Sequence, residues 1–270
     1  MNEVNKTLFI PLYGKARISK MGIILNDKDA ESIWGSCGFE IKGKSKSKWL
    51  AYNMAMRARI FDDWTRNELS LNPDALVLHL GCGLDSRYNR IQSPAVKWID
   101  IDMDEVITVR KSFYKETQNY SMLGMNLKDS EKLLKLPDAT NVIVIMEGVS
   151  MYLKNEELLK IMHILNEKYY HVHLLLDTYT VFAAKASKYK NPVNEVGVSE
   201  LYGVDDINEL IKNENYRLKK EYSMTPAHLI NELQGFDRAF FNLMFNNSLY
   251  SKFYRLYKLE NKNILDEQHI

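Results

Sequence analysis

Two glycines separated by one residue form the first chemically informative pattern in this chain. Gly81-Cys82-Gly83 comes directly after Leu76–Leu80, the apolar run LVLHL. The first glycine of such a turn permits a tight change of direction, and the second lets a ligand approach the backbone. Asp102 lies 19 residues beyond Gly83, at the end of the run VKWIDID. A carboxylate at this spacing can accept hydrogen bonds from both hydroxyls of a ribose, so the pattern predicts a nucleoside-containing cofactor.

The local pattern leaves the identity of the cofactor open. Ser86 stands where the dinucleotide fingerprint has its third glycine, and Asp85 would lie close to a pyrophosphate. A cofactor that carries a sulfonium cation and no phosphate meets no such objection. Three interpretations remain at this point: S-adenosylmethionine, a dinucleotide, or a glycine-containing turn that binds no ligand.

Alternating helices and strands must position these residues. The segment 48–69 has apolar side chains at helical spacing, which predicts an amphipathic helix: Leu50, Met54, Ala58, Phe61 and Trp64. Short apolar runs predict strands at 76–80, 96–102, 120–127, 141–146 and 171–177. Helices are expected between them at about 86–91, 105–116 and 155–167. This alternation predicts an α/β fold, a Rossmann-like parallel sheet with helices on both faces.

The C-terminal part is expected to complete the sheet. Its pattern predicts a helix at 205–213, a strand at 216–224, a helix at 227–246 and a strand at 253–259, with a helix as the alternative for the last segment. Aromatic residues are frequent between Phe236 and Tyr257. Core packing is the preferred interpretation of these aromatics. An apolar acceptor pocket or a dimer face is the alternative.

Composition excludes several classes of function. The chain has 270 residues, with 36 Lys and Arg against 35 Asp and Glu, and this balance argues against a nucleic-acid partner. No apolar run reaches the roughly 18 residues of a membrane span, and the N-terminus does not resemble a secretory signal. The two cysteines cannot form a disulfide framework, which favours a cytoplasmic location. His171 and His173 alone are a weak metal pair, so no metal is expected. The oligomeric state stays open.

Three segments in order resemble the leucine carboxyl methyltransferase family, which includes tetracenomycin-type polyketide O-methyltransferases. They are LHLGCGLDSR, WIDIDMDEV and IMEGVSMYL, and the family has LGxGLDTR, an acid followed by DxPEV, and EGxxxYL. The resemblance runs from about Thr7 to about Tyr179. It implies the class I S-adenosylmethionine-dependent methyltransferase fold, a seven-stranded, mostly parallel sheet whose last strand is antiparallel. Met103-Asp104 departs from the family pattern, so the loop after Asp102 is expected to be looser.

The resemblance also implies which residues bind S-adenosylmethionine. The loop Gly81, Cys82 and Gly83 lies under the methionine portion, and Asp102 binds the ribose. Asn126 and Leu127 occupy the adenine position, where the family usually has Asp-Leu. Asparagine keeps one acceptor and adds a donor, so adenine recognition is expected to differ in detail.

Three further residues are implied at the methionine end of the cofactor. Glu147, expected at the carboxyl edge of the sheet, would hold the ammonium group. Arg57 matches a family arginine that pairs with the cofactor carboxylate. Lys15 matches a basic residue of an N-terminal segment that closes over the site.

The nucleophile is expected to be an oxygen that needs no base. A carboxylate is already ionised at neutral pH, whereas a phenol or alcohol usually needs a base. None of the histidines stands in a pattern that indicates a base, so no catalytic residue is assigned and a carboxylate acceptor is favoured. Tyr152 is a candidate for orienting the substrate, with a packing role as the equal alternative.

The sequence therefore predicts an S-adenosylmethionine-dependent O-methyltransferase with a small-molecule, polyketide-like or peptide acceptor. Residues 1–70 are expected to form an N-terminal helical cap. Residues 71–270 are expected to form the methyltransferase core, with a helical insertion near its C-terminus. The alternatives are a nucleotide-dependent (NAD) oxidoreductase and a regulatory protein that binds S-adenosylmethionine without turnover.

Overall fold

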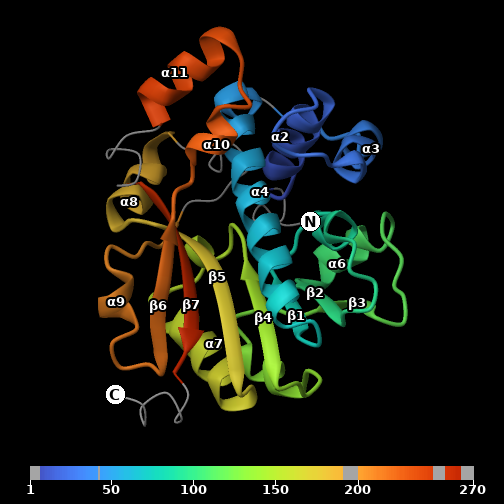
Figure 1. Cartoon of the computed structure of the whole chain (residues 1–270), viewed down its shortest axis with the longest axis vertical. Coiled ribbons are helices and arrows are strands. Elements are labelled where there is room, and N and C mark those ends of the chain that lie inside the picture. The colour runs from blue at the N-terminus through green and yellow to red at the C-terminus, as the bar shows by residue number, and fades with distance from the viewer. Residues whose placement is uncertain (1–6, 42, 191–199, 246–252, 263–270) are drawn as a thin grey trace.

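The centre of the molecule is a seven-stranded sheet covered by helices on both faces (Figure 1). This computed structural model describes residues 7–41, 43–190, 200–245 and 253–262. The strands are β1 (Leu76–Leu80), β2 (Trp98–Asp102), β3 (Tyr120–Gly124), β4 (Asn141–Met146), β5 (His171–Tyr179), β6 (Tyr216–Tyr222) and β7 (Tyr254–Asn261). They lie in the order β3-β2-β1-β4-β5-β7-β6.

The sheet is parallel except for its last strand. β1 pairs in parallel with β2 and with β4, and β4 pairs in parallel with β5. β7 lies between β5 and β6 and is antiparallel to both. The prediction of a seven-stranded, mostly parallel sheet is confirmed, and 253–259 belongs to a strand rather than to the alternative helix.

Two hydrophobic layers hold the helices to the sheet. Successive side chains of a strand point to opposite faces, so Val77 and Leu78 of β1 belong to different layers. The first layer packs against α2 (Phe9–Lys20), α3 (Lys28–Ser36) and α4 (Lys48–Leu71). The second packs against η2 (Ser130–Lys135), α7 (Asn155–Lys168) and α9 (Ile207–Leu210). The N-terminal helices thus share one continuous core with the sheet.

The remaining elements connect the strands. The order of the chain places η1 (Gly43–Lys46) before α4, and α5 (Arg87–Ile91) and α6 (Asp104–Arg110) after β1 and β2. η3 (Ser150–Tyr152) follows β4, and α8 (Val181–Lys190) follows β5. α10 (Ala227–Ile230) and α11 (Gly235–Phe245) lie between β6 and β7.

Three predicted helices differ from the structure. The helix expected at 227–246 is two helices, because the chain turns at residues 231–234 and the second helix starts at Gly235, whose φ of +50° does not continue a right-handed helix from the preceding residues; residue 246 lies outside the described residues. The helix expected at 105–116 ends at Arg110, and the following chain turns so that the Tyr114 hydroxyl donates to Leu84 O. The helix expected at 205–213 is limited to Ile207–Leu210.

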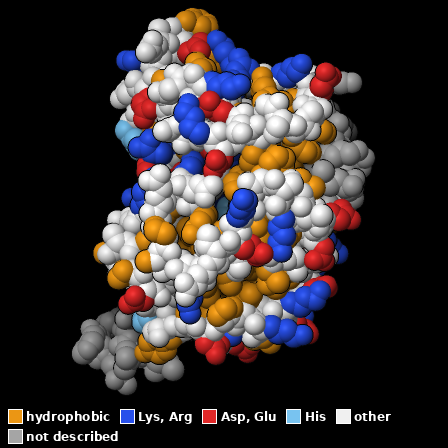
Figure 2. All heavy atoms as spheres, turned by 90° about the vertical axis from the view of Figure 1, so that its right-hand side faces the viewer, with side chains coloured by type: hydrophobic (Ala, Val, Ile, Leu, Met, Phe, Trp, Pro, Cys, Tyr) orange, Lys and Arg blue, Asp and Glu red, His pale blue; other side chains and the backbone are white. Residues whose placement is uncertain are grey.

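α2 crosses α4 closely where both approach the carboxyl edge of the sheet. A Cβ added to Gly14 of α2 would lie 2.9 Å from the Met54 Cβ of α4, so the glycine permits the approach. The next residue, Lys15, is buried against the sheet edge. No helix among the described residues is long and apolar enough to cross a membrane. On the face shown in Figure 2, acidic and basic side chains are interspersed.

Candidate active site

A cavity of about 940 Å³ lies at the carboxyl edge of the parallel strands. It extends from the ends of β2 and β3, past β1 and β4, to β5 and α8. Ligands of open α/β sheets bind at this edge because the strands end there and their loops separate. The structure brings all ten of the predicted site residues to its wall: Lys15, Arg57, Gly81, Cys82, Gly83, Asp102, Asn126, Leu127, Glu147 and Tyr152.

The glycine loop is built for close approach. Gly81 has φ +67° and Gly83 has φ +53°, a region that favours glycine. A Cβ added to Gly81 would also overlap with the Val149 side chain. Between the two glycines, Cys82 is buried, and burial raises the pKa of its thiol well above the usual range. Cys82 is therefore a neutral thiol in the loop and not a thiolate nucleophile.

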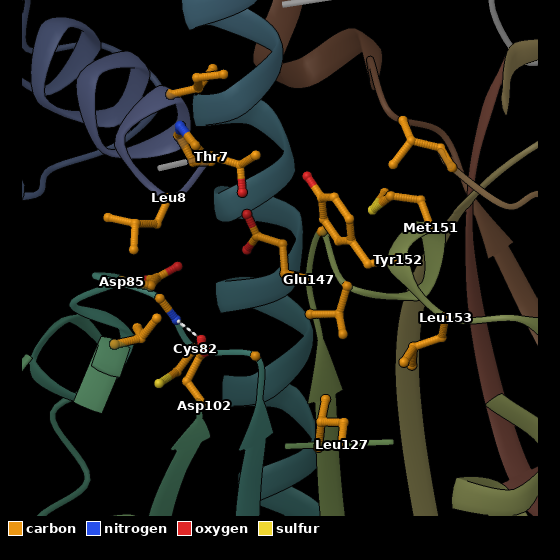
Figure 3. A pocket seen from close by; sticks show the side chains of 18 of the residues that line it. Thr7, Leu8, Cys82, Asp85, Asp102, Leu127, Glu147, Met151, Tyr152 and Leu153 are labelled. Carbon is orange, nitrogen blue, oxygen red and sulfur yellow. Dashed lines mark hydrogen bonds between the residues drawn. The ribbon is translucent and has the colours of Figure 1, made fainter. Parts of the chain in front are cut away.

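Asp102 ties the end of β2 to this loop. Its Oδ2 accepts a hydrogen bond from Gly83 N at 2.7 Å (Figure 3). Its Oδ1 accepts one from Met103 N at 2.8 Å. Burial raises the pKa of the Asp102 carboxyl, although both backbone bonds act in the opposite direction. Each oxygen retains a second acceptor site for a ligand hydroxyl. The loop after Asp102, which was expected to be looser, is held by the Met103 bond and by the start of α6.

The buried ion pair of Arg110 and Asp100 supports the glycine loop. The sequence did not predict this pair. Arg110 donates to Asp100 and to Gly83 O, the latter at 3.0 Å. Asp100 also lies 3.2 Å from His79 Nδ1. Asp100 precedes Asp102 by two residues on β2, so its side chain lies on the same face of the strand. The only sequence signal was the second acid in WIDID.

Glu147 is held at the end of β4 by two arginines. Its Oε1 accepts from Arg57 Nε at 2.9 Å, and its Oε2 accepts from Arg87 Nη2. Burial alone would raise the pKa of this carboxyl, but Arg87 and Arg57 lower it below its usual range. Glu147 is therefore an anion at neutral pH, with one acceptor site left on each oxygen. Arg87 is a further residue that sequence reasoning did not assign to the site.

Arg57 presents one nitrogen to the cavity. Its Nε binds Glu147, and its Nη1 donates to Asp177 at 3.2 Å and to the Tyr254 hydroxyl at 2.6 Å. The described residues offer no hydrogen bond to Nη2, and Arg57 lines the cavity. A buried guanidinium with an unused donor is suited to an anionic ligand group. The cofactor carboxylate that the sequence assigned to Arg57 has a donor available there.

Lys15 reaches the cavity from α2 and meets Asp85 of the glycine loop. Its Nζ lies 2.9 Å from Asp85 Oδ2, and both side chains are buried. Arg87 and Arg90 also contact Asp85. Burial would raise the pKa of Asp85, but these cations hold it well below its usual range. Asp85 is thus ionised and lies on the wall of the cavity, beside any ligand at the glycine loop.

The two ends of the cavity differ in character. Asn126 and Leu127 follow β3 beside Asp102, and Asn126 is exposed whereas Leu127 is buried. At the other end, Tyr152 forms a side-chain hydrogen bond with Thr7. Burial raises the pKa of the Tyr152 phenol to about 12. In Figure 3 its ring stands beside Glu147, and Glu147 and Asp85 point into the same space.

His79 lines the cavity but has no free nitrogen. Its Nδ1 faces Asp100, and its Nε2 lies 3.2 Å from Arg87 Nη1. Because a guanidinium only donates, Nε2 accepts from Arg87, and Nδ1 is the nitrogen that faces the Asp100 carboxylate. Both ring nitrogens are therefore engaged within the protein.

One group of side chains elsewhere has ligand atoms close enough for a metal. Glu68, His173 and Glu260 lie at the opposite end of the sheet, with these atoms within 4.8 Å of one another. Lys258 Nζ already lies between the acids, 2.6 Å from Glu68 Oε1 and 3.1 Å from Glu260 Oε1. The four side chains together form an ion cluster.

Comparison with known families tests the resemblance in these motifs. The family model for leucine carboxyl methyltransferase matches residues 18–165, more than half of the chain. The chain belongs to this family. The match includes the glycine loop, Asp102 and Glu147, which the structure places on one cavity wall.

Two curated relatives of this chain are methyltransferases according to their names. The tetracenomycin polyketide synthesis O-methyltransferase TcmP of Streptomyces glaucescens is 32% identical over 165 residues, covering 59% of this chain and 61% of TcmP. The S-adenosyl-L-methionine-dependent methyltransferase dpfgK of Gibberella zeae is 27% identical over 179 residues, covering 60% of each chain. The matches thus span about three-fifths of the relatives' length.

A solved structure confirms the fold over nearly the whole chain. A candidate methyltransferase from Thermobifida fusca superposes with a TM-score of 0.55 at 13% identity, covering 93% of this chain and 94% of that one. At this identity the likeness concerns the fold alone. The Rossmann-like class I methyltransferase fold predicted from the sequence is confirmed.

Proposed function

We propose that this protein transfers a methyl group from S-adenosylmethionine to an oxygen of a small-molecule acceptor. The observation that carries the proposal is the shared cavity wall: the glycine loop, the ribose-type acid Asp102, and Arg57 with an unused donor lie along it. The names of both curated relatives support methyl transfer.

The chain's own residues fit this cofactor from end to end. Asn126 and Leu127 would border the adenine, and Asp102 would accept hydrogen bonds from the ribose hydroxyls. Arg57 Nη2 and Lys15 Nζ would hold the carboxylate, and Glu147 the ammonium group. Bound S-adenosylmethionine supplies an electrophilic methyl carbon on a sulfonium. The acids Asp85, Asp102 and Glu147 make this part of the cavity favourable for a cation.

A carboxylate is the acceptor group that this cavity suits best. In-line displacement needs a positioned nucleophile and the exclusion of water, and an ionised carboxylate needs no base. Two basic candidates in the described wall are already engaged: His79 by Asp100 and Arg87, and Glu147 by two arginines. The protein would therefore position the acceptor, and the ionised carboxylate of the acceptor would itself be the nucleophile.

Two alternatives from the sequence differ from this proposal in measurable ways. A nicotinamide oxidoreductase would place a pyrophosphate beside the glycine loop, where Asp85 is an anion. A regulatory protein that binds S-adenosylmethionine without turnover would have the same cofactor site and yield no methylated product.

Calorimetric titration with S-adenosylhomocysteine, with NADH as a parallel control, tests the cofactor. We expect micromolar binding of S-adenosylhomocysteine alone. Binding of NADH alone would overturn the proposal. Turnover is then tested with methyl-labelled S-adenosylmethionine and a panel of carboxylic and phenolic acceptors. Label found only in methyl esters supports the carboxylate, and label found only in methyl ethers contradicts it.

A further inference from the structure

The cavity continues beyond the part that the cofactor would fill. Asp102, Asn126 and the glycine loop account for its end over β1, β2 and β3. The other end lies over β4 and β5, where the wall comes from η3, α8 and residues 200–202. A volume of about 940 Å³ is near the upper end of the ~300–1,000 Å³ that ligand sites occupy, so there is room for a second molecule.

The chemistry of the wall changes between the two ends. The cofactor end carries the charged groups described above. The described side chains that η3, α8 and residues 200–202 contribute are mainly apolar or aromatic: Met151, Tyr152, Ala183, Ala186, Leu201 and Tyr202. Glu200 is the charged side chain among the described residues there, and it is exposed. Such a wall binds flat apolar surface, since aromatic rings and methionine sulfur pack against rings.

The walls of this compartment are fixed by the backbone. Tyr202 N donates to Met151 O at 2.8 Å, and Val204 N donates to Tyr179 O at 2.7 Å. A Cβ added to Gly203 would overlap with Thr180 O, so the segment lies directly on the turn between β5 and α8. A wall held in this way does not have to be ordered when a ligand binds, which favours affinity.

The side chains that the described residues of α8 contribute to the compartment are small. Ala183, Ala186 and Ser187 line it, at the i, i+3 and i+4 positions that form one face of a helix. Lys185, between them in the sequence, is exposed and does not line the cavity. A large side chain on the small face would occupy the compartment without reaching the loop or Asp102.

We propose that the small face of α8 sets the size of the acceptor, which is a ring-containing, largely apolar carboxylic acid. This assignment rests on the proposed function and deepens it. Ala183, Ala186 and Ser187 leave space for the ring system, and Tyr152 and Tyr179 lie on the side nearest β4 and β5. Ala186 is the residue through which acceptor size is most directly changed, because it lines the cavity and its side chain is exposed rather than buried.

The test compares A186F with K185F, which adds the same ring to the outward face of the same helix. The probe is 2-naphthoic acid, titrated into protein saturated with S-adenosylhomocysteine. We expect the wild type and K185F to bind the probe alike, and A186F to bind it at least about tenfold more weakly. The affinity of all three proteins for S-adenosylhomocysteine is expected to stay within about threefold. A183L is a second, smaller filling substitution with the same expected direction.

Each outcome has a distinct meaning. If A186F and A183L bind the probe as tightly as the wild type, α8 does not bound the acceptor. If the wild type binds S-adenosylhomocysteine but no 2-naphthoic acid, the acceptor class is wrong. If the wild type does not bind S-adenosylhomocysteine, the proposed function itself fails. Equal loss of probe binding in K185F would show a general effect on the helix and overturn the assignment.

Discussion

At the scale of single residues, Arg57 shows how one side chain serves both stability and binding. Its guanidinium holds Glu147, Asp177 and the Tyr254 hydroxyl, and still presents Nη2 to the cavity. Burying the guanidinium is costly unless such partners compensate it. The pairing keeps Arg57 charged, and its pKa is raised well above the usual range although burial acts against this.

We expect R57K to weaken binding of S-adenosylhomocysteine by about ten- to a hundredfold, or ~1.5–3 kcal/mol, because lysine keeps the charge but loses the planar fork. The matched control is R59K on the same helix, where the side chain is 37% exposed. Calorimetry measures the affinities, and thermal unfolding checks that both variants fold. Equal affinities of R57K and the wild type would remove Arg57 from the site.

At the scale of elements, the turn between β1 and α5 depends on backbone geometry that glycine alone provides easily. Gly81 combines a positive φ with the neighbouring Val149 side chain. Gly22, at the end of α2, has a similar φ of +70°, but a Cβ added there would meet nothing within 4 Å. Comparing a substitution at Gly22 with one at Gly81 therefore separates the cost of a positive φ from the cost of close packing.

We expect G22A to lower the free energy of unfolding by about 1–2 kcal/mol, which is the penalty of a left-handed conformation for alanine. G81A is expected to cost a further ~1–3 kcal/mol through overpacking, and to weaken cofactor binding because the loop must shift. Denaturant unfolding gives the free energies, and titration with S-adenosylhomocysteine gives the affinities. Equal destabilisation by the two substitutions would show that the close approach to Val149 is not required.

At the scale of the whole molecule, the ion cluster of Glu68, His173, Lys258 and Glu260 joins α4 to β5 and β7 at the end of the sheet away from the cavity. Burial would lower the pKa of His173, but Glu260 and Glu68 raise it from 6.5 to about 9. The protonated form is therefore favoured in the folded state. The contribution of protonated His173 to the free energy of unfolding is complete below pH 6.5. It is lost as the pH rises from 6.5 to about 9.

The free energy of unfolding of the wild type should exceed that of H173Q by about 1–3 kcal/mol at pH 6, and this difference should shrink as the pH rises through 9. H163Q is the control, since His163 is 59% exposed and its ion pair with Glu167 is worth little. Denaturant unfolding across the pH range measures both differences. A difference for H173Q that stays constant up to pH 10 would contradict the assigned protonation.

The sequence determined most of the sheet and the cofactor end of the site, because these depend on local patterns. Buried parallel strands are short apolar runs, so Leu76–Leu80 and Asn141–Met146 were predicted with the bounds that the structure has. Strands that end at one edge bring their following residues together, which is why Gly81, Asp102 and Glu147 meet although they are far apart in the chain.

Only the tertiary structure decided which groups neutralise one another and where the acceptor space lies. Arg87 reaches Glu147 across 60 positions of the chain, and Lys15 meets Asp85 only because α2 crosses α4 at Gly14. The small face of α8 had no motif, since any small residue leaves the same space. Such contacts depend on the packing of distant elements, and no local periodicity encodes them.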